Sequence, residues 1–290
     1  MQTNEVSDNR AELIRLALAE DFGSGDVTSL YFVPEGLTAR ALMRPRKRGV
    51  LSGVEVAAEV FKAVDPALKV DVCLHDGEEV STDAVIMVIE GSARSILGAE
   101  RTALNFIQRL SGVATMTRRY VRAIEHTSCK LLDTRKTTPG YRLLEKAAVV
   151  HGGGNNHRLG LYDRAMVKDN HLMTDGNVEH LQACITRLKQ ERPGVEVELE
   201  ADHLAQVEAF LKLEGVDYIL LDNMSPEQMR AAIALRGERA KPYFEASGGL
   251  TLETAPAAAE SGVDFMSFGC LTHSVPSLDI GLDFTTLPSC

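Results

Sequence analysis

The feature that most constrains the fold is a regular alternation that begins near residue 130. Short apolar runs alternate there with amphipathic stretches of helical spacing. The runs are KLLD, RAMVK, VEVELE, VDYILLD, PYFEA and VDFMSFG. Six βα units in succession predict a parallel sheet that closes into an α/β barrel. A doubly wound open sheet, which uses the same units, is the structural alternative.

The first part of the chain lacks this rhythm. A short helix over about residues 9–20, the strand-like runs ARALM and AVIMVIEG, and the helical GVEVAAEVFKAV predict a mixed α+β domain. A long helical pattern opens at Ser92, a plausible N-cap, and the Ser111-Gly112 pair is expected to kink or break it. We therefore expect an α+β domain over residues 1–111 and the barrel over residues 112–274, with residues 275–290 able to pack back on the first domain.

The predicted strands end in polar or small residues, and in a barrel these ends converge on the active site. In strand order the ends are Asp133, Arg135 and Lys136; Lys168 and Asp169; Glu198 and Glu200; Asp222 and Asn223; Ser247, Gly248 and Gly249; and Gly269 with His273. One charged strand end is unremarkable, because strands often finish at a wet rim. Four consecutive charged strand ends followed by two loops of small residues predict a binding site at the C-terminal end of the barrel.

A basic island lies inside an acidic protein. The segment from Lys130 to His171 holds eight Lys and Arg against four Asp and Glu, a net +4, within a chain of net charge −10. Such focused positive charge favours a small anion, because arginine grips carboxylates and phosphates bidentately. A solvated basic face is the alternative reading. The glycine-rich loops SGG and FGCLTH favour phosphate binding on backbone N–H groups.

Composition excludes several classes of protein. A pI near 5.3 argues against nucleic acid or an anionic membrane as a general partner. The five cysteines form no CxxC pair, so neither a disulfide framework nor a zinc site is indicated, and a reducing cytoplasm fits. The run HGGGNNH does not match a P-loop. The 290 residues contain no apolar run of about 20, so a soluble, unexported protein is expected.

Several longer motifs resemble one enzyme family. In order and spacing, the runs ERTALNFIQRLSGVAT, DTRKTTPGYRLLEKAAVVHGGGNNHRLGLYDRAMVKDNH, ILLDNM, EASGGL and GVDFMSFGCLTHS are similar to quinolinate phosphoribosyltransferases, the carboxylating nicotinate-nucleotide pyrophosphorylases. The resemblance covers essentially the whole chain. It implies a sandwich-like α+β domain, an incomplete α/β barrel of six or seven parallel strands, and a homodimer with shared active sites. It also implies phosphoribosyl transfer from phosphoribosyl pyrophosphate (PRPP) to quinolinate with decarboxylation.

The same resemblance implies a role for individual residues. The implied quinolinate site consists of Arg135, His157, Arg158 and Lys168, with Arg101 entering from the partner subunit, and Lys136 is shared by both substrates. Glu198 and Asp222 are implied at the ribose and Mg²⁺ end of PRPP. The implied phosphate loops of PRPP contain Ser247, Gly248, Gly249, Gly269 and His273. Lys136, Glu198 and Asp222 are the implied catalytic residues. Both substrates are polyanions, which would explain a cationic pocket in an acidic chain.

Two other functions stay open at this point. Lys168 could form a Schiff base with a carbonyl substrate, as in aldolases. The chain could instead be a binding or accessory module, because a molybdenum-transport-associated family resembles this one.

Overall fold

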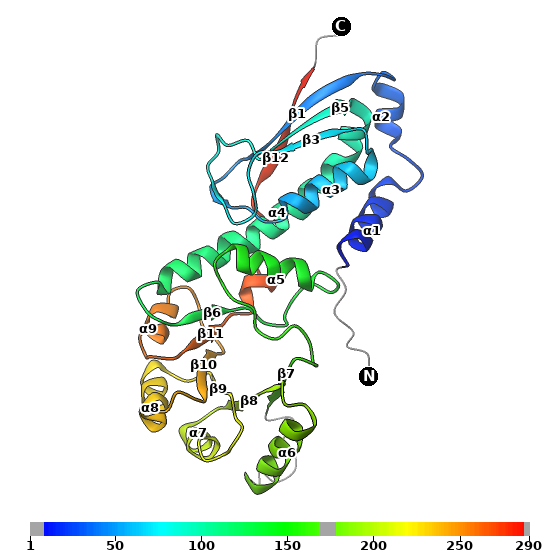
Figure 1. The fold of residues 1–290 in the computed structure, drawn as a ribbon. Helices are drawn as coiled ribbons and strands as arrows, with labels where there is room; N and C mark the ends of the chain where they lie inside the picture. The colour runs from blue at the N-terminus through cyan, green and yellow to red at the C-terminus, as the bar shows by residue number, and fades with distance from the viewer. Residues whose placement is uncertain (1–8, 169–177, 287–290) are drawn as a thin grey trace. The chain divides into compact units, whose positions relative to one another are not determined.

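The computed structural model describes residues 9–168 and 178–286. The chain forms two compact units (Figure 1). Unit 1 comprises Met1–Arg118, Thr138–Gly153 and Ser274–Cys290, and unit 2 comprises Arg119–Thr137 and Gly154–His273. The expected boundary between residues 111 and 112 lies inside one helix, and unit 1 extends seven residues further, to Arg118. Residues 138–153, which the expected second domain included, cluster with unit 1.

Unit 1 is an α+β unit. Its helices are α1 (Arg10–Phe22), α2 (Val27–Phe32), α3 (Val54–Val64), α4 (Ala93–Ile124) and α5 (Arg142–His151), and the last turns of α4 belong to unit 2. Its strands are β1 (Thr38–Pro45), β2 (Gly49–Val50), β3 (Lys69–Val72), β4 (Glu79–Val80), β5 (Met87–Ser92) and β12 (Ile280–Thr286). The main sheet has the antiparallel order β12-β1-β5-β3. The C-terminal strand thus returns to this unit.

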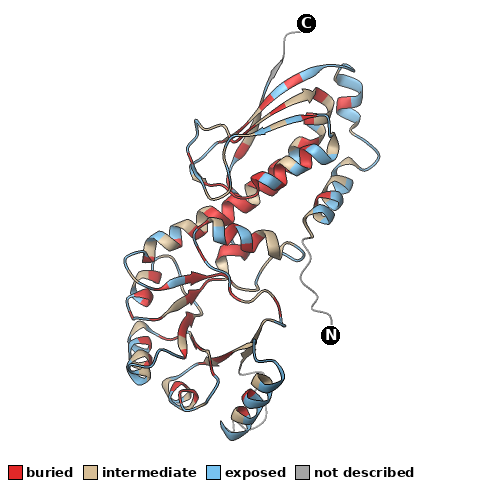
Figure 2. Ribbon diagram, in the orientation of Figure 1, coloured by how far each residue is buried: buried red, intermediate tan, exposed pale blue. Residues whose placement is uncertain are grey.

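One face of this sheet is buried under α3 and α4 (Figure 2). Alternate residues of β1, such as Ala41 and Met43, are buried, as expected for a sheet with one covered face. They join one hydrophobic cluster with Val60 and Phe61 of α3 and Ile107 of α4. The predicted helices and the two predicted strands of this half are therefore present.

The expected break at Ser111-Gly112 was wrong, because α4 is continuous from Ala93 to Ile124. Both residues serve packing. The Ser111 hydroxyl accepts from the Ser52 N–H at 3.0 Å and donates to the Ser52 carbonyl at 3.1 Å. A Cβ on Gly112 would lie 2.4 Å from the Pro276 carbonyl oxygen, so only glycine fits there. The small pair lets two backbone segments approach the helix.

Unit 2 contains the six predicted strands of the βα repeats, and the helix that follows the first of these strands, α5, belongs to unit 1. Its strands are β6 (Lys130–Leu132), β7 (Arg164–Val167), β8 (Glu196–Ala201), β9 (Tyr218–Asp222), β10 (Tyr243–Ser247) and β11 (Phe265–Ser267), and its helices are α6 (Val178–Glu191), α7 (Leu204–Phe210), α8 (Pro226–Arg236), α9 (Ala255–Ala259) and α10 (Cys270–His273). Local signals set these bounds: α8, for example, begins at a capping box formed by Ser225 and Gln228.

The strand order decides between the two predicted architectures. The parallel sheet runs β6-β11-β10-β9-β8-β7, so each strand from β7 onward lies beside its successor and the last strand pairs with the first. This is the order of a barrel, whereas a doubly wound sheet reverses direction midway. Because β6 and β7 are the two edges of the sheet, the barrel is incomplete. The predicted fold class is confirmed.

Candidate active site

A cavity of about 270 Å³ lies within unit 2. Side chains that follow β6 and β7 line it together with residues of β8, β9 and β10. Eight residues predicted from the sequence lie at its wall: Arg135, Lys136, His157, Arg158, Lys168, Asp222, Ser247 and Gly248. The cavity therefore brings cations from two strand ends into one space with the glycine-rich loop.

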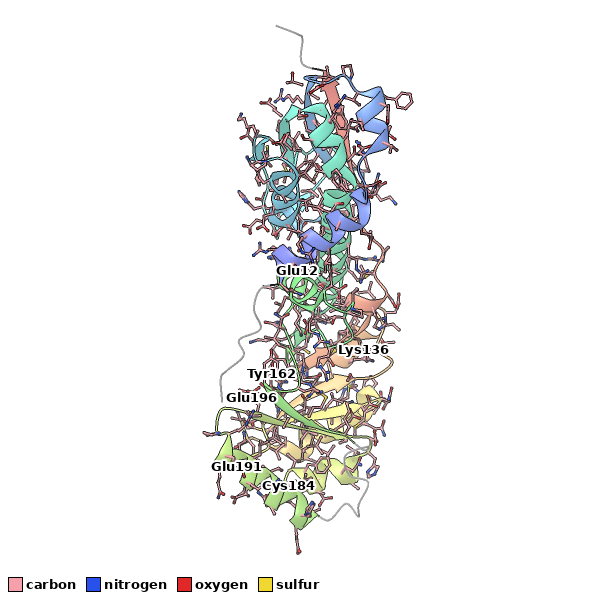
Figure 3. All side chains as sticks on the ribbon, turned by 90° about the vertical axis from the view of Figure 1, so that its right-hand side faces the viewer. Glu12, Lys136, Tyr162, Cys184, Glu191 and Glu196 are labelled. Atoms are coloured by element: carbon pink, nitrogen blue, oxygen red, sulfur yellow. The ribbon has the colours of Figure 1, made fainter. Side chains whose placement is uncertain are left out.

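The cations after β6 are set by a tight turn. The Lys136 N–H donates to the Thr134 hydroxyl at 3.0 Å, and the Thr137 N–H donates to the Arg135 carbonyl at 2.9 Å. The Thr272 hydroxyl in α10 donates to the Lys136 carbonyl at 2.8 Å. Figure 3 labels Lys136, whose side chain is exposed. The backbone here is held while the ammonium group stays accessible.

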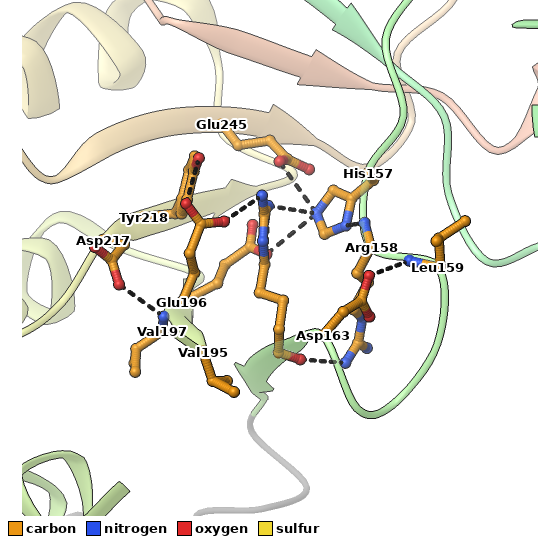
Figure 4. A network of polar contacts seen from close by, with 12 residues as sticks. His157, Arg158, Leu159, Asp163, Val195, Glu196, Val197, Asp217, Tyr218 and Glu245 are labelled. Carbon is orange, nitrogen blue, oxygen red and sulfur yellow. Dashed lines mark hydrogen bonds and ion pairs between the residues drawn. The ribbon is translucent and has the colours of Figure 1, made fainter. Parts of the chain in front are cut away.

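The glycine- and asparagine-rich loop places His157 and Arg158. Buried Asp133, at the end of β6, accepts the His157 N–H at 2.7 Å. Asp163 accepts the Leu159 N–H at 2.6 Å (Figure 4) and the Gly160 N–H at 3.0 Å, which closes the turn after Arg158. Two aspartates therefore shape the loop that presents the two predicted quinolinate ligands.

A buried charged cluster surrounds the His157 ring (Figure 4). Its Nε2 lies 3.1 Å from Glu198 Oε2 and 3.3 Å from Glu245 Oε2, and the three side chains are 3%, 0% and 0% exposed. The Arg164 guanidinium lies 3.5 Å from Glu198 and 2.9 Å from Glu196, above the Tyr218 ring. Glu198 thus lies behind the cavity wall, tied to two cations.

This environment shifts two pKa values. Desolvation of the buried ring lowers the pKa of His157, but the nearby carboxylates of Glu198 and Glu245 outweigh it and raise that pKa above its ordinary value. Burial, followed by the nearby Glu245 charge, raises the pKa of Glu198. The Arg158 N–H donates to His157 Nδ1 at 2.7 Å, so this ring nitrogen serves as an acceptor. Nε2 is therefore the ring nitrogen that faces both carboxylates, and it lies closer to Glu198 than to Glu245.

The other side of the cavity joins an acidic residue to the glycine-rich loop. Asp222 Oδ2 accepts from the Asn223 side chain at 2.6 Å, and the Asn223 N–H donates to the Ser247 carbonyl at 2.9 Å. Gly248 has φ 82°, and a Cβ there would lie 2.4 Å from Asn223 Oδ1. Only glycine fits this position, so the SGG loop is held tightly against the end of β9.

The remaining predicted residues have different placements. A Cβ on Gly269 would lie 2.8 Å from Lys136 Cδ and 3.1 Å from the His273 ring, so this loop lies against Lys136. Gly249, with φ 58°, follows Gly248. Arg101 is an exposed residue of α4 in unit 1. The expected strand-end residue Asp169 lies outside the described residues.

Sequence reasoning missed part of the cavity. Glu245, Thr134 and Met166 line it and were not predicted, whereas Glu200, one of the predicted strand-end residues, also lines it and is ion-paired with the Lys168 ammonium. Glu245 could have been found, because it interrupts the apolar run PYFEA and lies two residues before Ser247, on the same face of the strand. A lone carboxylate inside a buried strand is a signal of function or of a buried ion pair.

Comparison with known proteins identifies the family. The description "Quinolinate phosphoribosyl transferase, N-terminal domain" matches residues 26–111, and the corresponding C-terminal domain matches residues 113–283. The chain belongs to the quinolinate phosphoribosyltransferase family.

Relatives and solved structures of this family span nearly the whole chain. The nicotinate-nucleotide pyrophosphorylase [carboxylating] of Mycobacterium leprae is 43% identical over 95% of this chain and 97% of its own length. The probable enzyme of that name from Bacillus subtilis is 40% identical over 94% and 93%. The structure of NadC from Streptococcus pyogenes has a TM-score of 0.89 at 37% identity and covers 99% of this chain and all of that one.

Proposed function

We propose that this member of the family transfers phosphoribosyl from PRPP to quinolinate with decarboxylation, giving nicotinate mononucleotide, pyrophosphate and CO₂, a step of NAD biosynthesis. The observation that carries this function is the cationic cavity of unit 2, where Arg135, Lys136, Arg158 and Lys168 face one space beside the glycine-rich loop. Two polyanions need such a pocket, because a cation within reach of each carboxylate or phosphate offsets its lost hydration.

The cations divide between the two substrates. Arg135, His157, Arg158 and Lys168 bind the carboxylates of quinolinate, and Lys136 contacts both substrates. Ser247, Gly248 and Gly249, with Gly269 and His273, bind phosphate groups of PRPP. The close contact of Gly269 with Lys136 and His273 supports this grouping, since it brings a glycine loop, an ammonium and an imidazole together. Holding both substrates in near-attack contact is the main contribution of the protein.

Chemistry follows from this positioning. Loss of pyrophosphate from ribose C1 develops oxocarbenium character, which the fixed carboxylates Glu198 and Asp222 stabilise electrostatically. Attack of the pyridine nitrogen on C1 forms a pyridinium. The positive nitrogen stabilises the electron pair left on the adjacent carbon when its carboxylate leaves as CO₂, and a proton then binds to that carbon. Neither a covalent enzyme intermediate nor a prosthetic group is required.

Mg²⁺ is proposed as the cofactor, and Asp222 is the residue that fits it, because this carboxylate lines the cavity. Glu198, the second residue expected from the sequence to hold the ion, lies behind the cavity wall, 3.5 Å from the Arg164 guanidinium, and does not fit. Carboxylate oxygens are the protein ligands that Mg²⁺ prefers. When bound, the ion would neutralise charge on the departing pyrophosphate.

A homodimer with shared active sites is also proposed. Helix α2 carries exposed apolar side chains: Tyr31 is 78% and Phe32 83% exposed, and Val27 and Leu30 are also exposed. Apolar surface of this kind is typical of an interface. In this assembly Arg101, which is exposed on α4, would complete the quinolinate site of the partner subunit.

We propose a cytoplasmic location. Cys73, Cys129, Cys184 and Cys270 are free thiols, as is usual in a reducing compartment. Within residues 9–168 and 178–286, no helix has the length and apolar character needed to cross a membrane. The acidic balance of the chain supports small-molecule substrates over nucleic acid as partners.

The aldolase-like alternative is disfavoured by the surroundings of Lys168. Its Nζ is engaged by the Glu200 carboxylate, so this nitrogen is already committed to an ion pair and does not point freely at a carbonyl substrate. Borohydride trapping with a carbonyl substrate tests this alternative, and we expect no adduct at Lys168.

Incubation with quinolinate, PRPP and Mg²⁺ tests the proposed function. We expect nicotinate mononucleotide to form at the rate at which pyrophosphate appears. Binding of both substrates without this product would instead indicate a binding or accessory module.

A further inference from the structure

Glu245 is a buried carboxylate that the proposed roles above leave unused. It lies in β10, is 0% exposed, and lines the cavity. Neither of its carboxylate oxygens has a hydrogen-bond partner in the described structure. Its closest cation is His157, whose Nε2 lies 3.3 Å from Glu245 Oε2 (Figure 4). A buried carboxylate in this state is costly unless something else binds it.

The cluster around Glu245 contains more acceptors than donors. The Nε2 of His157 carries one N–H, and it lies closer to Glu198, at 3.1 Å, than to Glu245. Glu198 Oε2 is also 3.5 Å from Arg164. Glu198 Oε1 and both oxygens of Glu245 are left without donors. The cavity therefore presents buried acceptors to its ligand as well as cations.

The chemistry of the substrates identifies what these acceptors bind, provided that the proposed function is right. Ionised quinolinate offers two carboxylates and a pyridine nitrogen, and the phosphates of PRPP offer mainly charged oxygens, so all of these groups accept hydrogen bonds. The ribose hydroxyls are the neutral donors in the pair of substrates. A hydroxyl can donate to a buried carboxylate without adding charge, and bonds of this kind are strong.

The position of Glu245 fits this ligand. It lies two residues before Ser247 on the same face of β10, so it is about 6.6 Å deeper along the strand than the proposed phosphate loop. A sugar whose phosphate is bound at that loop would place its hydroxyls at a similar distance from the loop. We propose that Glu245 is a substrate-binding residue that accepts a hydrogen bond from a ribose hydroxyl of PRPP.

A metal ion is the competing occupant. Ligand atoms of His157, Glu198 and Glu245 lie within 4.8 Å of one another, as a cation site would require. Arg164, however, lies 3.4 Å from His157 Nε2 and 3.5 Å from Glu198 Oε2. A permanent cation at this distance repels a divalent ion, so the geometry favours a neutral donor.

The test compares ribose 5-phosphate with its 2-deoxy and 3-deoxy analogues, titrated calorimetrically into the full protein without metal or quinolinate. The wild-type protein should bind ribose 5-phosphate about 10-fold more tightly than one of the analogues, as expected for a lost bond to a charged acceptor. Glu245→Ala should lose that preference and keep its affinity for quinolinate within about two-fold. Glu227→Ala, which removes an exposed carboxylate on α8, is the matched control and should keep the preference.

Two results would overturn the assignment. One is a Glu245→Ala protein that still prefers ribose 5-phosphate. The other is weakened binding of quinolinate alone, which would mean that Glu245 only holds His157. If Glu245→Ala does not fold, Glu245→Gln keeps the size of the side chain and should reduce the preference, because its amide is a weaker acceptor than a carboxylate. Absence of nicotinate mononucleotide from the wild-type reaction would refute the proposed function but leave the sugar titrations readable.

Discussion

Two buried charged clusters, one in each unit, differ in how completely their carboxylates are satisfied. In unit 1, fully buried Glu145 accepts from Arg109 Nη2 at 2.8 Å, from the Thr138 hydroxyl at 2.9 Å and from the Thr138 N–H at 2.9 Å. In unit 2, Glu198 and Glu245 share His157 and keep three oxygens without a hydrogen bond. The first cluster is complete by itself, whereas the second needs a ligand to complete it.

This difference separates structural charges from functional ones. A satisfied network rigidifies the fold, and removing one partner leaves a buried charge. A network with spare acceptors beside a cavity is instead kept for what it binds, at a cost in stability. Predictions for the two clusters therefore differ in kind: changes in unit 2 should affect activity, and changes in unit 1 should affect stability.

The largest effect is expected at the cavity wall of unit 2. Lys136→Ala should lower kcat/KM by about 1,000-fold, because a cation aimed at developing or transferred negative charge is removed. Since Lys136 is exposed, its free energy of unfolding should change by less than about 1 kcal/mol. Steady-state kinetics and denaturant unfolding measure the two effects, with Lys212→Ala, also an exposed lysine of unit 2, as the control. A large loss of stability would return Lys136 to a structural role.

Substrate choice tests the quinolinate-binding cations. Nicotinate lacks the 2-carboxylate, so it would leave part of the cluster of Arg135, Arg158 and Lys168 without a partner. Its kcat/KM should be lower than that of quinolinate by about 100-fold or more. Competition between the two substrates in one reaction measures this ratio. Comparable turnover of nicotinate would contradict the assignment of these three residues.

The complementary change in unit 1 should affect stability. Glu145→Ala leaves Arg109 without its carboxylate and should lower the free energy of unfolding by about 3 kcal/mol. The KM values of the protein that remains folded should be unchanged. Glu59→Ala, which removes a partly exposed ion pair with Arg10, should cost less than about 1 kcal/mol. If Glu145→Ala alters substrate affinity without loss of stability, the contrast between the two clusters is wrong.

A partial recovery of activity in mixed dimers tests whether Arg101, an exposed side chain of unit 1, contributes to the active site of the partner subunit. If Arg101 completes the partner's site, Arg101→Ala and Lys136→Ala homodimers should both be nearly inactive. Random reassociation in equal amounts makes half of the dimers mixed, each with one intact site, so about 25% of wild-type activity should return. Mixed dimers are isolated by differential tags and assayed. Inactive mixed dimers would remove Arg101 from the site.

Much of the fold could be predicted because its signals are local and periodic. The six apolar runs of the barrel correspond to β6–β11. The break expected at Ser111-Gly112 failed because the reason for the small residues lies far along the chain, at Ser52 and Pro276. Contacts between segments so distant in sequence leave no periodic signal.

The candidate site was predicted only in part, for a similar reason. Strand-end position indicated Arg135, Lys136 and Asp222, all of which line the cavity. It also indicated Glu198, which the structure places behind the wall, against His157. Glu245 was missed although it interrupts the apolar run PYFEA, which was a usable signal. That its carboxylate lacks hydrogen-bond donors could be learned only from the structure.

We propose that the cavity of unit 2 couples phosphoribosyl transfer to decarboxylation. The decisive experiment incubates quinolinate labelled at the 2-carboxylate with PRPP and Mg²⁺ and counts released CO₂ and pyrophosphate in the same reaction. Because the pyridinium formed by transfer is the electron sink for CO₂ loss, we expect one labelled CO₂ for each pyrophosphate, and neither product from Lys136→Ala above about 0.1% of the wild-type rate. Pyrophosphate released without labelled CO₂, or CO₂ released without PRPP, would contradict it.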